Sequence, residues 1–172
     1  DDLFMKAIET YNFHTAALYW WGYSQLRIIS FPERKEPARM DDPRDDPDPE
    51  IPPDNTNGLL GFDVLTDFLE SDDWKPRRME DKYAYSMSYT GEHGDFRCYA
   101  ILRVELEEFL FYIVAPVRVP SDVRPAVTEY ITRANYGLRI GNFELDYADG
   151  EVRFKSSINF EGEDLTSGML RN

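Results

Sequence analysis

Residues 132–166 read TRANYGLRIGNFELDYADGEVRFKSSINFEGEDLT, and this stretch decides the fold. Asn135 and Gly137 predict the end of a helix, because glycine readily adopts the left-handed conformation of a helix cap. Two strands of alternating polarity follow, and Asp149-Gly150 predicts a tight hairpin turn between them. The expected inward-facing residues are Phe143, Leu145 and Tyr147 on the first strand and Val152, Phe154, Ile158 and Phe160 on the second.

Three further strands are predicted upstream of this stretch. Residues 83–89 alternate strictly, and in the next run Phe96 and Cys98 share one face while Ile101 lies on the other. The third strand, residues 109–115 (FLFYIVA), is apolar on both faces. Both faces of such a strand must be covered. The helices of the domain would cover one face, and a second subunit or a bound chain could cover the other.

Helices are predicted before, between and after these strands. The first follows Asn57 as its N-cap, and its apolar residues at helical spacing are Leu59, Phe62, Leu65, Phe68 and Leu69. The second begins near Pro125, and its buried stripe comprises Val127, Tyr130, Ile131 and Ala134. Thr166 could cap a last, short helix. The order α-β-β-β-α-β-β-(α) predicts an α+β fold around an antiparallel five-stranded sheet.

The composition divides the chain into three parts. Residues 1–31 are crowded with aromatic side chains, including Trp20, Trp21 and Tyr23, and form an aromatic-rich docking segment that we expect to be helical. Residues 32–57 are rich in proline and aspartate, so this part has little to bury and is expected to be an extended acidic linker. Residues 58–172 then form the folded domain.

The charge of the chain restricts the partners it could bind. The formal net charge is −14 over 172 residues, whereas nucleic-acid binding needs clusters of lysine and arginine. The most basic run, residues 75–78 (KPRR), is flanked by acidic residues and is expected to be a solvated loop. The acidity also disfavours anionic lipid and favours basic protein partners. No apolar run is long enough to span a membrane.

The sequence offers no catalytic, cofactor-binding or metal-binding constellation. His14 and His93 are the only histidines, too few to complete a metal site with Cys98, which is expected to be a small core residue rather than a nucleophile. The acidic run at residues 41–50 lacks the glycine and the glutamate of a calcium loop. We therefore expect a protein that is not an enzyme and that holds neither metal nor cofactor.

Three segments of the domain resemble one bacterial family. They are LFYIVAPVRVPSDVRPAV (110–127), ANYGLRIGNFELDYADGEVRFK (134–155) and FEGEDLT (160–166). Together they make residues 59–166 similar to the YbjN family, whose fold resembles the chaperones of type III secretion systems, and most similar to its cyanobacterial and plastid-type members. The resemblance implies a chaperone-like fold and a loosely described regulatory role, and it supplies no catalytic residues to carry over.

Two functions from different classes follow from these observations. The first is a non-catalytic protein-binding module, a chaperone-like adaptor or regulator. The second is an accessory structural subunit of a larger assembly, such as a photosynthetic complex of a plastid, anchored through the aromatic segment. The expected protein-binding residues are Trp20, Trp21 and Tyr23 in that segment and Ile101, Leu110, Tyr112 and Val114 on the outer face of the sheet.

The compartment and the assembly follow less directly from the sequence. A single cysteine cannot form an internal disulfide, which indicates a reducing compartment. We expect the cytoplasm, with the plastid stroma as the alternative that the family resemblance implies. A homodimer is the second arrangement to consider beside a complex with another protein. The aromatic segment could pack either on its own domain or on a partner.

Overall fold

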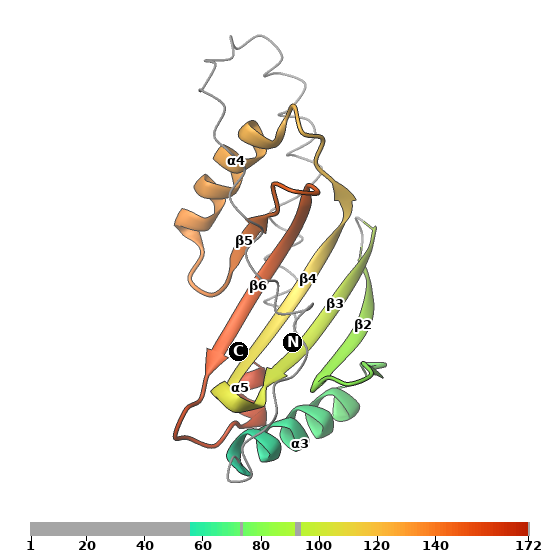
Figure 1. Cartoon of the computed structure of the whole chain (residues 1–172), viewed down its shortest axis with the longest axis vertical. Coiled ribbons are helices and arrows are strands. Elements are labelled where there is room, and N and C mark those ends of the chain that lie inside the picture. The colour runs from blue at the N-terminus through green and yellow to red at the C-terminus, as the bar shows by residue number, and fades with distance from the viewer. Residues whose placement is uncertain (1–55, 73, 92–93, 172) are drawn as a thin grey trace.

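An antiparallel sheet is the centre of the computed structural model, which describes residues 56–72, 74–91 and 94–171 (Figure 1). In this part of the chain the sheet has six strands in the order β1-β2-β3-β4-β6-β5. The strands are β1 (Arg77–Arg78), β2 (Ala84–Gly91), β3 (Gly94–Arg103), β4 (Glu108–Arg118), β5 (Asn142–Leu145) and β6 (Glu151–Asn159). The predicted α+β class and the antiparallel pairing are confirmed, with one more strand than expected.

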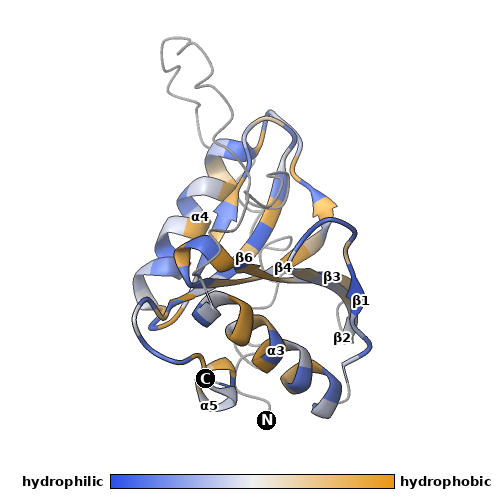
Figure 2. Ribbon diagram, turned by 60° about the horizontal axis from the view of Figure 1, so that its bottom comes forward, coloured by the Kyte–Doolittle hydropathy of each residue, from blue (hydrophilic) through white to orange (hydrophobic). Residues whose placement is uncertain are grey.

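The helices lie at the two ends of the long strands. They are α3 (Thr56–Ser71), the 3-10 turn η1 (Val104–Leu106), α4 (Arg124–Gly137) and α5 (Ser167–Leu170). Figure 1 shows α3 across one end of the sheet with α5 beside it, and α4 next to β5 at the other end. Figure 2 shows α3 beneath the strands. The order of elements therefore matches the predicted one, apart from β1.

One face of the sheet, the helix-covered face, carries the main hydrophobic core. Leu65 and Leu69 of α3 and Ile131 and Ala134 of α4 belong to this core. The sheet residues that they join include Tyr85, Met87, Phe96, Cys98, Ala100, Leu102, Phe109, Ile113 and Phe154. Cys98 is fully buried among them, so its predicted place in the core is confirmed.

The strand β1 corrects the expectation of a solvated loop at residues 75–78. The backbone N–H of Met79 donates to the carbonyl oxygen of Ala84 at 3.0 Å, which helps to hold β1 against β2. The guanidinium carbon of Arg78 lies 4.2 Å from the centre of the Phe62 ring, 5.3 Å from that of Tyr83 and 5.7 Å from that of Tyr85. The attraction between the Arg78 cation and these three aromatic rings stabilises this edge of the sheet. The local sequence pattern does not predict this arrangement.

Two expectations for α4 are wrong. Tyr130 is 37% exposed, because it is one residue, or about 100° around a helix, away from the buried Ile131. Gly137 is the last helical residue and has no left-handed backbone. The side chain of Asn135 instead forms two hydrogen bonds with the backbone of Phe143 at the start of β5, and these bonds hold the end of α4 next to that strand. In the connection between α4 and β5, the glycine with a left-handed backbone is Gly141.

The connection between β5 and β6 is longer than the predicted two-residue turn. The backbone N–H of Gly150 donates to Asp146 at 2.9 Å, and the Asp146 carboxylate accepts from the N–H of Ala148. Tyr147 is therefore in the loop and 49% exposed, not inward-facing on the strand. Its hydroxyl hydrogen-bonds Thr128 at 2.6 Å, so the loop is tied to α4.

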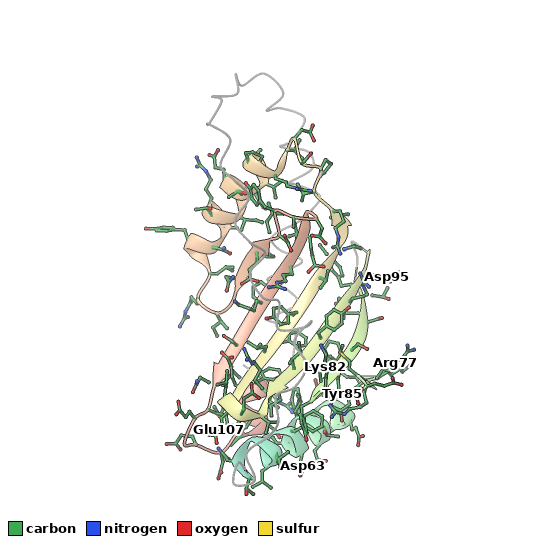
Figure 3. All side chains as sticks on the ribbon, viewed as in Figure 1. Asp63, Arg77, Lys82, Tyr85, Asp95 and Glu107 are labelled. Carbon is green, nitrogen blue, oxygen red and sulfur yellow. The ribbon has the colours of Figure 1, made fainter. Side chains whose placement is uncertain are left out.

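The side chain of Glu107 accepts hydrogen bonds from residues near the beginning and near the end of the described domain. Asn57 lies inside the first turn of α3 instead of capping it, and its side-chain amide donates to the Glu107 carboxylate at 2.9 Å. The same carboxylate accepts from the N–H of Gly162, and Figure 3 places Glu107 at this end of the sheet. Thr166 caps α5 by accepting from the N–H of Met169, as predicted.

Candidate functional site

The second face of the sheet, opposite the helix-covered face, carries the sheet residues predicted to bind protein. Ile101 is directly opposite Leu110 in the β3–β4 register, and Tyr112 and Val114 follow Leu110 at two-residue steps along β4. Ala84 of β2 pairs with Ile101. We call these five residues the second-face strip. The structure therefore brings the four predicted sheet residues together, and Ala84 is the member that sequence reasoning missed.

All five residues of the second-face strip are buried. Tyr112 is 1% exposed, Val114 2%, Ile101 3% and Leu110 5%. The expectation that both faces of residues 109–115 are covered is thus confirmed for these side chains. Within the described part of the chain, the hydrophobic residues packed against the cluster of Ala84, Ile101, Leu110 and Tyr112 are Met79 and Tyr99. The other predicted contacts, Trp20, Trp21 and Tyr23, lie outside the described residues.

Charged side chains border the strip on the β6 side. The guanidinium carbon of Arg153 lies 4.6 Å from the centre of the Tyr112 ring. Glu144 of β5 accepts from Nε of Arg153 at 2.7 Å and pairs with Nζ of Lys155 at 2.7 Å. Glu144 therefore holds both cations beside the strip.

The Glu144 carboxyl is strongly influenced by these neighbours. Burial by itself would raise its pKa, but the hydrogen bonds from Lys155 and Arg153, with the charge of Arg153, outweigh burial and hold the pKa below its ordinary value. The carboxylate is therefore ionised at neutral pH, and it fixes the orientation of Arg153 over the Tyr112 ring.

Arg77 and Arg97 lie on the other side of the strip, away from β6. Arg97 is directly opposite Val114, and Arg77 is opposite Ser86, which places both on the second face. Both are exposed, and neither forms a side-chain hydrogen bond or ion pair with another described residue. Figure 3 shows Arg77 pointing away from the sheet edge. The second face therefore combines the buried strip with exposed arginines at this border.

The described residues that could take part in covalent or metal chemistry lack the environment that such chemistry needs. Burial raises the pKa of the Cys98 thiol to about 12, so its nucleophilic thiolate is scarce at neutral pH. Among the described residues no group of three histidine, cysteine, aspartate or glutamate side chains is placed to hold a metal ion. His14, His93 and the acidic run at residues 41–50 lie outside the described residues. None of the helices in the described part of the chain has the length and hydropathy that crossing a membrane requires.

Comparison with known proteins identifies one family. The sequence model of the YbjN family, described as "Putative bacterial sensory transduction regulator", matches residues 62–172. No curated protein matches the chain.

Similar solved structures are a chain of the HopA1–SchA chaperone–effector complex, a chain of the ExsC–ExsE complex and YbjN from E. coli, which is described as a "putative transcription regulator". Their sequence identities to this chain are 18%, 15% and 13%, and their TM-scores 0.48, 0.47 and 0.47. They cover 66%, 67% and 64% of this chain, and the aligned parts make up 84%, 83% and 77% of theirs. These likenesses concern the fold alone, and no functional conclusion follows from them.

Proposed function

The chain belongs to the YbjN family, and we propose that it is a non-catalytic protein-binding module, a chaperone-like adaptor or regulator. The observation that carries this proposal is the second-face strip, a separate hydrophobic cluster in which Tyr112, Leu110 and Ile101 lie on the side of the sheet opposite the core that α3 and α4 cover. A sheet face with this composition is suited to hold a polypeptide, because buried tyrosines contribute strongly to binding at interfaces.

The partner contacts in this proposal come from two regions. The sheet contributes Ile101, Leu110, Tyr112 and Val114, and residues 1–31 contribute Trp20, Trp21 and Tyr23. The exposed guanidinium groups of Arg77 and Arg97 would set the orientation of the partner, since charges at an interface margin act on specificity and on association rate more than on affinity. A second copy of the chain is the other protein that this surface could receive.

The proposal treats the protein as a binder instead of an enzyme. Two observations support this. Burial keeps the Cys98 thiol protonated at neutral pH, and the Glu144 carboxylate forms ion pairs with Arg153 and Lys155. Both groups stabilise the fold and are poorly placed to exchange protons with a substrate. We propose the cytoplasm as the compartment. A cyanobacterial or plastid-type member in the plastid stroma is the alternative, which rests on the sequence of residues 110–166.

The alternative function is an accessory structural subunit of a larger assembly, such as a photosynthetic complex of a plastid. The aromatic composition of residues 1–31 favours it, because such a segment could anchor the domain to a neighbouring subunit. The two functions differ in which surface meets the partner. The adaptor presents the second face of the sheet, whereas the anchored subunit uses only residues 1–31.

Site-specific photo-crosslinking tests the proposed function. A photoreactive phenylalanine replaces Tyr99, which packs on the strip, and in a matched control it replaces Tyr136, which is 96% exposed on α4. We expect a defined intermolecular adduct from position 99 in the producing cell and none from position 136. The captured protein is then purified and titrated against the wild type, Tyr99→Lys and Tyr136→Lys.

The titration decides the outcome. Tyr99→Lys should weaken binding at least ~10-fold, because a tyrosine at an interface centre commonly contributes more than about 1.4 kcal/mol, and Tyr136→Lys should leave it unchanged. Equal binding by all three proteins would show that the partner does not meet the second face. Loss of binding only on substitution of Trp20, Trp21 and Tyr23 would favour the anchored subunit.

A further inference from the structure

Three exposed leucines lie at the end of the sheet where α3 meets η1. Leu60 of α3 is 54% exposed, Leu106 of η1 47% and Leu59 of α3 39%. Leu60 is two residues, or about 200° around the helix, from the buried Gly58, so it lies on the outer side of α3. We call these three residues the leucine surface, and Figure 2 turns this end of the molecule toward the viewer. Exposed apolar side chains that gather at one place, with polar residues around them, are typical of a binding site.

One carboxylate and one amide hold together the segments that carry the leucine surface. The side-chain amide of Asn57 donates to the Glu107 carboxylate at 2.9 Å and to the carbonyl oxygen of Glu163 at 3.0 Å. The Glu107 carboxylate also accepts from the N–H of Gly162 at 2.9 Å. Leu106 directly precedes Glu107 and is therefore held next to the first turn of α3. A surface that is ordered in this way before a partner arrives costs less free energy to bind.

The margin of the leucine surface is acidic. The segments that meet here are residues 56–71, 104–108 and 160–166, and each contains three carboxylates and neither lysine nor arginine. Figure 3 places Asp63 and Glu107 at this same end of the sheet. Six of the carboxylate side chains are exposed and form no hydrogen bond or ion pair with another described residue: Asp63, Asp67, Glu70, Glu161, Glu163 and Asp164.

The described arginines that flank these segments already have partners. Nε of Arg103 pairs with the Glu105 carboxylate at 3.3 Å. The guanidinium carbon of Arg171 lies 5.8 Å from the centre of the Phe68 ring. The negative charge around the leucine surface is therefore directed to solvent, where it can attract a cationic partner.

We propose that the leucine surface binds a basic amphipathic segment of another protein. The apolar side chains of that segment cover Leu59, Leu60 and Leu106, and its lysines or arginines meet the surrounding carboxylates. This arrangement has the apolar centre and polar rim of a protein interface. The leucine surface shares no residue with the second-face strip, so the inference goes beyond the proposed function and gives the domain a second contact region.

Charge selects this partner over a second copy of the chain. Two copies that met through the leucine surface would bring their acidic margins together, and like charges at a desolvated contact are unfavourable. The chain as a whole carries a formal net charge of −14, which adds to the repulsion. An acidic peptide is disfavoured for the same reason. A basic segment instead gains from the carboxylates in selectivity and in association rate, while the leucines supply most of the affinity.

A titration of the full chain with a synthetic probe peptide tests this inference. The probe is a helix-forming peptide of leucine and lysine with one apolar face, and the control peptide has glutamate in place of every lysine. Leucine methyl signals locate the contact by nuclear magnetic resonance. The variant Leu60→Ser/Leu106→Ser removes two exposed side chains, and the matched control Val117→Ser changes a residue that is 55% exposed near the opposite end of β4.

The lysine peptide should shift the methyl signals of Leu60 and Leu106, and the glutamate peptide should not. The double variant, shown to be folded by circular dichroism, should bind the lysine peptide at least ~10-fold more weakly, since burial of one leucine corresponds to roughly tenfold or more in affinity. Val117→Ser should bind as the wild type does. The charge variant Asp63→Asn/Asp67→Asn should weaken binding in dilute salt and reduce its dependence on salt concentration.

Three results would overturn the inference. They are equal binding by the wild type and the double variant, equal binding of the two peptides, and methyl shifts at Leu60 and Leu106 that depend on protein concentration alone, which would assign the surface to a second copy. The outcome is separable from that of the proposed function. Failure of the peptide titration with a crosslinked partner at position 99 would remove this inference and leave the adaptor standing.

Discussion

The packing of α3 on η1 gives the sharpest stability prediction. Gly58 lies where α3 touches η1, and a Cβ atom built there would be 2.2 Å from the carbonyl oxygen of Val104 and 2.8 Å from its Cγ1. Gly61, one turn further along the same helix, offers a matched control. Its added Cβ would be 3.0 Å from the ring end of the buried Phe160, a side-chain contact that a shift of a few tenths of an ångström relieves.

The magnitude follows from the two distances. A contact of 2.2 Å with a backbone oxygen falls about 1 Å short of ordinary van der Waals distance, so α3 must move away from η1, at a cost of about 1–3 kcal/mol. Both alanine substitutions gain up to ~1 kcal/mol of helix propensity. We therefore expect Gly58→Ala to lower the free energy of unfolding by about 1 kcal/mol net, and Gly61→Ala, which has the same propensity gain and a milder contact, to lower it by less than that.

Urea titration followed by far-UV circular dichroism measures both variants against the wild type. The slopes of unfolding free energy against urea should be equal, so that the midpoints report stability alone. If Gly58→Ala were as stable as Gly61→Ala, α3 would not pack on η1 as the structure shows. The reasoning about the whole helix-covered face would then fail.

Three further predictions concern single side chains. Tyr112→Asp should lower the free energy of unfolding by about 4 kcal/mol because a charge would enter a buried face, whereas Tyr112→Phe should cost about 1 kcal/mol; a Tyr112→Asp protein as stable as wild type would contradict the burial. The Glu144 carboxylate, whose pKa is lowered in the fold, contributes stability above the unfolded-state pKa that is lost as pH falls through the folded-state pKa. Glu144→Gln should therefore flatten the decline of stability below about pH 4.5, and an unchanged pH profile would refute the ion-pair assignment. The Cys98 thiol, with a pKa of about 12, should react with a disulfide reagent at pH 8 at least ~100-fold more slowly in the native protein than in urea, and equal rates would show that it is accessible.

The strands could be predicted from local patterns because alternation is a property of neighbouring residues. FLFYIVA indicated a strand covered on both faces, and the structure buries Ile113 on one face and Tyr112 on the other. The same alternation placed Ile101, Leu110, Tyr112 and Val114 on one face, which the β3–β4 register confirms. Their role in protein binding remains a prediction.

The errors arose where tertiary contacts or side-chain hydrogen bonds decide the conformation. Tyr147 continued the alternation of β5 in sequence, but the Asp146 carboxylate bonds the N–H of Ala148 and ends the strand. Arg77 and Arg78 had the composition of a solvated loop. Arg78 is held by the rings of Phe62, Tyr83 and Tyr85, which come together only once α3 packs on the sheet.

The central claim is that the second face of the sheet is a protein-binding surface. Oxidative footprinting of tyrosine side chains, with and without the partner captured by crosslinking, tests it most directly, and Tyr136, 96% exposed, is the internal reference. Adding the partner should lower the modification rate of Tyr99, which packs on the second-face strip, while the rate of Tyr136 stays constant. An unchanged rate at Tyr99 would contradict the account.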